Sequence, residues 1–169
     1  DGNVYVTGAA TDTINGYDIH TLKDNASGNL VWTKTWNDTT YNSNDSAVAI
    51  VGDTLGNLYI IASSTRAENR DYLILKYDTA GNELWNIAYN GLDNGDDIPA
   101  AIAIEPSTND IYVTGSVEES TGLTYLTLRL KEIDVIIPQD TSDVLDAWDY
   151  TANLGQLMNT DTTVNTNVI

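Results

Sequence analysis

The sequence contains no cysteine, only one histidine and one methionine, and few basic residues. Without cysteine it has no disulfide scaffold, no thiol nucleophile and no thiolate metal site. Seven lysine and arginine residues stand against 25 aspartate and glutamate residues, so the formal net charge is −18. A surface of that sign repels phosphate backbones and anionic lipid headgroups, so we expect neither nucleic acid nor membrane surfaces as partners. No apolar run approaches the roughly 20 residues that would predict membrane insertion.

The chain does contain an internal repeat of about 53 residues, which indicates a repeat architecture. Tyr5, Tyr59 and Tyr112 lie 54 and 53 positions apart and occupy the same place in three copies of one motif. The matched segments are residues 2–8, 56–62 and 109–115; residues 18–23, 71–76 and 124–129; residues 28–32 and 81–85; and residues 47–51 and 100–104. Four matched segments at one spacing predict a unit of four short elements.

Each matched segment is rich in β-branched and aromatic residues and is bounded by Gly, Asn, Asp and Ser, which predicts strands between tight turns. The connections at residues 25–29 and 78–82 have the length of hairpins, so we expect antiparallel sheets. In residues 71–77, Leu73 and Leu75 alternate with Tyr72 and Ile74, and both sets are apolar. Because a sheet with one wet face would alternate apolar and polar residues, this pattern predicts sheets covered on both faces, as in a β-propeller.

These motifs resemble a known family. Gly-Asn-Val-Tyr-Val-Thr-Gly, Asp-Tyr-Leu-x-x-Lys-Tyr-Asp, Gly-Asn-Glu-Leu-Trp and Asn-Gly-x-x-Asn-Gly-Asp-Asp are similar to the SBBP repeat of secreted and surface bacterial and archaeal proteins, named for seven-bladed propellers. The resemblance covers residues 1–131 and implies four-stranded propeller blades in an extracellular or cell-surface protein. It implies no catalytic residue and no cofactor. The chain departs from the motif where Ile61 and Ala62 replace Thr-Gly, and where His20 replaces an apolar residue.

The number of units predicts an incomplete propeller. Dividing 169 residues by 53 gives about three units, whereas propellers close with roughly four to eight blades. The first unit begins at its second strand, and the third lacks the Gly-Asn…Trp strand. We therefore expect the partners of this domain to be the remainder of the same polypeptide or other copies of the chain.

An acidic C-terminal extension, residues 132–169, follows the blade domain of residues 1–131. Residues 133–138 fit a strand or a linker, and residues 142–158 fit a helix, with residues 147–151 as an alternative strand. Residues 159–169 alternate Thr, Val and Asn and could dock on a sheet edge. Four aspartates of the extension recur at intervals of three and would lie on one side of a helix, facing a cation, a basic partner or solvent: Asp140, Asp143, Asp146 and Asp149.

Three further features bear on chemistry. His20 could be a general base or metal ligand, but it occupies the position of Leu73 and Leu126, which favours a partly buried core histidine. Residues 90–97 concentrate carboxylate and amide oxygens of the kind that Ca²⁺ prefers, although turns favour the same residues and the spacing is not that of an EF-hand. Glycosylation sequons begin at Asn25, Asn37 and Asn44, in predicted exposed turns.

These observations favour a non-catalytic extracellular scaffold, adhesion or binding module with a protein or glycan ligand. Two alternatives stay open. One is a structural subunit of an extracellular filament or surface layer that is completed by strand exchange. The other is part of a propeller enzyme acting on polysaccharide, with its site on chain outside this sequence. Within the sequence no catalytic cluster converges, and repeat-equivalent charges such as Lys23, Lys76 and Arg129 suggest scaffolding.

Overall fold

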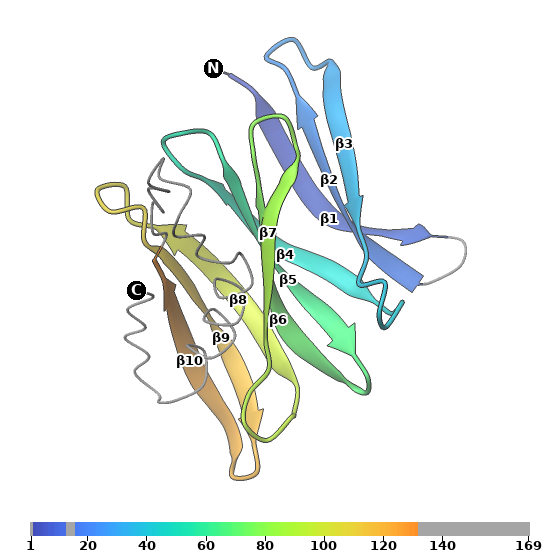
Figure 1. Ribbon diagram of the computed structural model, residues 1–169, viewed down its shortest axis with the longest axis vertical. Helices are drawn as coiled ribbons and strands as arrows, with labels where there is room; N and C mark the ends of the chain where they lie inside the picture. The colour runs from blue at the N-terminus through green and yellow to red at the C-terminus, as the bar shows by residue number, and fades with distance from the viewer. Residues whose placement is uncertain (1, 13–15, 132–169) are drawn as a thin grey trace, which may run out of the picture.

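The structure, a computed structural model, describes residues 2–12 and 16–131 as an all-β protein with ten strands in three antiparallel sheets (Figure 1). The first sheet has the order β1 (Val4–Asp12), β2 (Gly16–Asp24), β3 (Leu30–Trp36). The central sheet has the order β4 (Asp45–Gly52), β5 (Leu58–Arg66), β6 (Asn69–Tyr77), β7 (Glu83–Tyr89). The third sheet has the order β10 (Gly122–Leu130), β9 (Ile111–Glu119), β8 (Asp97–Ile104).

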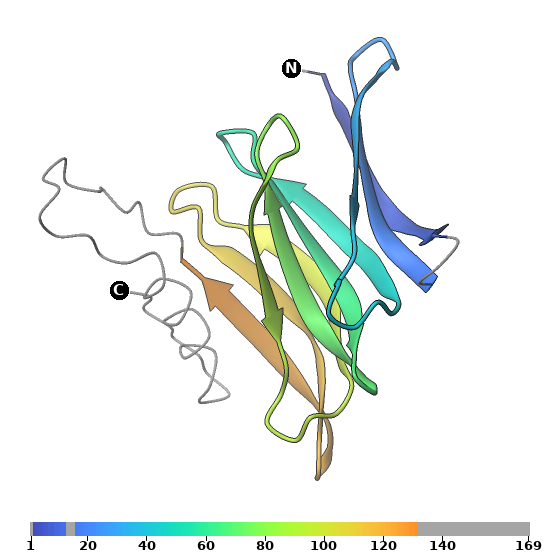
Figure 2. The same cartoon turned by 45° about the vertical axis from the view of Figure 1, so that its right-hand side comes forward.

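The three sheets are stacked in chain order, with the central sheet between the other two (Figure 2). Two separate clusters of buried apolar side chains fill the two junctions. Within residues 2–12 and 16–131 the stack does not close on itself, and no helix there is long and apolar enough to cross a membrane. We call the face of each sheet that points along the direction from the third sheet to the first its front face. The opposite face, which points from the first sheet to the third, is its back face.

The central strand β6 shows why both of its faces are apolar. Leu73 and Leu75 lie in the cluster shared with the first sheet, whereas Tyr72 and Ile74 lie in the cluster shared with the third, and all four are fully buried. Burying one such side chain contributes about 1.5–3 kcal/mol. The prediction that this sheet is covered on both faces is confirmed.

The predicted hairpins are also confirmed, and an Asx turn closes each of them. Asn25 Oδ1 accepts hydrogen bonds from the backbone N–H groups of Ser27 and Asn29, and Asp78 Oδ1 accepts the equivalent bonds from Ala80 and Asn82. These bonds, that of the Asn82 backbone first, lower the pKa of the Asp78 carboxyl. The register shift that follows each hairpin falls at the equivalent point, after Lys23 in the first sheet and after Lys76 in the central sheet.

The prediction for His20 is wrong, because the structure leaves this side chain exposed. Its repeat equivalents Leu73 and Leu126 are buried, since the first and central sheets cover the front faces on which they lie. His20 lies on the front face of the first sheet, and no sheet of residues 2–12 or 16–131 covers that face. The expectations for the extension at residues 132–169 fall outside the described residues.

Equivalent positions therefore differ in what a mutation costs. We expect Leu73→Ala to lower the free energy of unfolding by about 2–5 kcal/mol, because it leaves a cavity in a buried cluster. His20→Ala should change the free energy of unfolding by no more than about 0.5 kcal/mol. Urea unfolding followed by tryptophan fluorescence measures both values. Equal effects at the two positions would contradict the assignment of covered and free faces.

Candidate functional site

A tyrosine, a cation and a tryptophan recur on the back faces of the sheets. Lys23 lies over the ring of Tyr5, with 5.3 Å from Nζ to the ring centroid, and Lys76 lies over Tyr59 at 5.1 Å. In the third sheet Arg129 lies over Tyr112 and forms an ion pair with Asp110. Trp32 and Trp85 complete the first two groups, with ring centroids 6.1 and 6.0 Å from those of Tyr5 and Tyr59. Cation–π and aromatic pairs of this kind stabilise packing.

The first of these groups holds the central sheet in place. Lys23 Nζ and Trp32 Nε1 donate to the carbonyl oxygen of Thr79, in the β6–β7 turn, over 3.1 and 3.4 Å. The same turn needs glycine at Gly81, because φ is +78° there and a Cβ would lie 2.9 Å from the Trp32 ring. Lys23 thus acts in the stacking of the first sheet on the central one.

Buried aspartates recur where neighbouring sheets meet. Asp45 Oδ2 accepts the backbone N–H of Asp38 over 3.0 Å, and Asp97 Oδ2 accepts that of Gly91 in the equivalent loop. Burial raises the pKa of both carboxyls. Asp71, which is also buried, has a pKa raised to about 6, mainly by burial and further by the charges of Asp97 and Asp96. Asp45 and Asp97 thus fix loops, and burial disfavours the charged form of all three carboxyls.

The candidate calcium loop at residues 90–97 is held by donors from the protein itself. Asp93 accepts the Ser120 backbone N–H over 2.6 Å, Asp96 accepts the Arg70 backbone N–H and guanidinium, and Asp97 accepts Gly91 N–H. The three carboxylates are thereby engaged by three different donor sets. In the part of the chain that the structure describes, no three or more acidic or histidine side chains are arranged to hold a metal ion. This geometry gives calcium no support.

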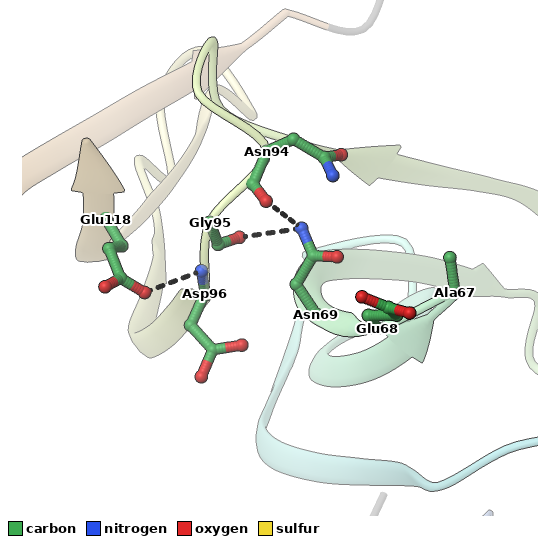
Figure 3. Close-up of a pocket in the computed structure, with 7 residues that line it drawn as sticks. All are labelled: Ala67, Glu68, Asn69, Asn94, Gly95, Asp96 and Glu118. Atoms are coloured by element: carbon green, nitrogen blue, oxygen red, sulfur yellow. Dashed lines mark hydrogen bonds between the residues drawn. The ribbon is translucent and has the colours of Figure 1, made fainter. Parts of the chain in front are cut away.

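The same loop borders an open pocket of about 480 Å³ (Figure 3). The pocket lies between the β5–β6 turn, the β7–β8 loop and β9, and it is lined by Ala67, Glu68, Asn69, Asn94, Gly95, Asp96 and Glu118. Asn69 Nδ2 donates to the carbonyl oxygens of Asn94 and Gly95, and the Asp96 N–H donates to Glu118 Oε2 over 3.1 Å. The lining thus presents carboxylate and amide groups to solvent, which suits a hydroxyl-rich or cationic ligand.

The charge state of Asp96 argues against a general-acid role for this residue. Hydrogen bonds from Arg70 lower the pKa of Asp96, so this carboxyl stays ionised at neutral pH. A general acid would need a raised pKa.

The sequence pattern singled out residues 90–97, and the structure places three residues of this loop beside the β5–β6 turn. It missed Glu118, which replaces the Thr65 of the second unit; comparing the units for charge differences would have shown this residue.

The other candidate residues lie apart from this pocket. His20 Nε2 is 3.0 Å from Thr35 Oγ1, on the exposed front face of the first sheet. Asn44 is exposed, and its Oδ1 accepts the Tyr17 N–H. Asn25 and Asn37 are half-buried, contrary to the expectation that all three sequons are exposed. Asp140, Asp143, Asp146 and Asp149 lie outside the described residues.

No protein-family model matches this chain, and no curated protein matches it in sequence. The resemblance to the SBBP repeat therefore stays a prediction that depends on the quoted motifs.

The raised pKa of Asp71 predicts an unusual pH dependence of stability. Its folded pKa of about 6 exceeds the ordinary aspartate pKa of 3.8, so the folded state binds this proton more tightly than the unfolded state does. The stability it contributes is full below pH 3.8 and is lost as pH rises through 6. We expect Asp71→Asn to raise the free energy of unfolding by about 1–3 kcal/mol at pH 7. Chemical unfolding at pH 7 and pH 4 should show that this gain shrinks at the lower pH.

Asp93→Asn is the matched control, because hydrogen bonds from Ser120 lower the pKa of this exposed carboxyl. Its contribution to stability is present above the unfolded pKa and is lost as pH falls, so this variant should be less stable than the parent at pH 7. A gain in stability at pH 7 from both variants would indicate a general effect of net charge.

Proposed function

We propose that this chain is a non-catalytic extracellular scaffold or binding module made of propeller-type blades. Three sheets of one repeat stack face to face, and the central one is buried by its two neighbours. The observation that carries the proposal is that equivalent residues make equivalent packing contacts, as the pairs of Lys23 with Tyr5 and Lys76 with Tyr59 do. Such repeated contacts are typical of structures that serve as supports for loops.

The pocket of Figure 3 is the surface that we assign to ligand binding. It lies on turns and a loop at one end of the central sheet, where a rigid scaffold positions variable side chains. Its carboxylates and amides can exchange hydrogen bonds with hydroxyl groups, so we propose a glycan, or the polar surface of a protein, as the ligand. Extracellular or cell-surface localisation is part of this proposal and is drawn from the motif resemblance.

Binding to an array of extracellular glycans tests the proposal. Glu68 lines the pocket from the β5–β6 turn and is exposed, so Glu68→Ala should leave the fold intact and weaken glycan binding by about tenfold or more. Glu83→Ala is the matched control, because Glu83 begins β7 and so lies at the opposite end of that strand from the β7–β8 loop. Equal glycan binding by both variants would contradict the assignment of the pocket as the binding site. Hydrolysis of a polysaccharide by the protein would contradict the non-catalytic proposal and favour the enzyme alternative.

A subunit of a filament or surface layer is the second candidate. It is favoured by the exposure of apolar side chains on the two outermost faces of the stack, because exposed apolar patches mark interaction surfaces.

A further inference from the structure

The two ends of the stack expose faces that are buried elsewhere in the same molecule. On the back face of the third sheet, Tyr125 is 93% exposed, whereas its repeat equivalents Tyr72 and Ile19 are fully buried. On the front face of the first sheet, Val4 and Val6 are 54% and 50% exposed, whereas their equivalents Leu58 and Ile60 are buried. Each end thus presents one half of a junction whose complete form exists twice inside the stack.

The back face of the third sheet repeats the chemistry of a face that already binds a sheet. Thr114 and Thr127 pair through their hydroxyl oxygens over 3.1 Å, as Thr7 and Thr21 do over 3.0 Å. Arg129 over Tyr112 repeats Lys23 over Tyr5. In the first sheet this face is covered by the front face of the central sheet, and Thr21 is buried there. The third sheet is therefore suited to the front face of another sheet of this repeat.

The sizes of facing side chains identify which front face fits. Tyr72 packs against Gly115, where a Cβ would overlap the Tyr72 hydroxyl and also the Ile98 carbonyl oxygen of the neighbouring strand. The smaller Ile19 shares its cluster with Ala62, the equivalent of Gly115. Tyr125 is again a tyrosine and so favours glycine opposite it. The remaining equivalent position is Gly8, on the front face of the first sheet, and a Cβ at Gly8 would meet no atom within 4 Å.

We infer that a second copy of this chain stacks head to tail on the first, with its Gly8 seated against Tyr125. This inference rests on the proposed blade stacking and names the partner. The described residues of two copies contribute six sheets, which lies within the range of about four to eight that close a propeller. Each copy carries a formal net charge of −18, so association strengthens with added salt.

Two blocked variants test the inference in the full-length chain. Tyr125→Asp places a charge on the back face, and Gly8→Val fills the front face. Neither change should disturb the fold, because Tyr125 is exposed and the site of a Cβ at Gly8 is open. Sedimentation velocity in high salt should show association by the parent chain, loss of association for each variant alone, and a 1:1 complex when the two are mixed. Leu55→Asp, at an exposed turn away from both faces, is the control and should associate like the parent.

A size exchange tests the pairing of Tyr125 with Gly8. Gly8→Ala should weaken association by about tenfold, and adding Tyr125→Ile in the same chain should restore it, because Ile19 and Ala62, at the equivalent positions, already belong to one buried cluster. A parent chain that stays monomeric at all concentrations overturns the inference. So does loss of association by Tyr125→Asp with no effect of Gly8→Val, which would indicate back-to-back pairing. Glycan binding by monomeric Tyr125→Asp keeps this outcome separate from the proposed pocket.

Discussion

The structure depends on one constraint, which is that a β-sheet with two apolar faces must be covered on both. The strand β6 shows this constraint most clearly, since Leu73 and Leu75 face one neighbouring sheet while Tyr72 and Ile74 face the other. An isolated sheet of this composition would expose both rows to water, at a cost of about 25 cal/mol for each Å² of apolar surface. Stacking in chain order covers both faces of the central sheet. Within the described stack it leaves one face of the first sheet and one face of the third sheet uncovered.

Polar groups are adjusted to that stacking. The carboxylate of Asp97 holds the loop that connects the central and third sheets, although burial raises its pKa. Asp71 carries a similar cost, and one of its oxygens is buried with no hydrogen-bond partner among the described residues. A fold can tolerate such unfavourable contributions to its stability when the free energy gained by apolar burial elsewhere is larger. The acids that sequence inspection suggests as ligands or catalysts are thus in part structural, and their environments show this better than their identities do.

The repeat predicted most of the fold, including the strands, the hairpins and the alternation of faces, because each of these follows from local pattern and spacing. It did not predict the exposure of His20, since periodicity shows which face a residue lies on but not whether a neighbour covers that face. The pocket was predicted only in part. Residues 90–97 were singled out for their composition, but Glu118 reaches the pocket from a different unit, and contacts between units are not visible in one unit's pattern.

Threonines on the back face of the third sheet could be explained as an adaptation to solvent, because Thr127 stands where the central sheet has the buried Ile74. The first sheet shows that this explanation is not sufficient. Thr21 occupies the same position, forms the same hydroxyl pair with Thr7, and is nonetheless buried beneath the central sheet. A pair of hydroxyls that satisfy each other is accepted in a buried junction at little cost. Polarity at these positions therefore does not mark a face as free, and the exposure of Tyr125 between such threonines is better explained as an unfilled junction than as a finished surface.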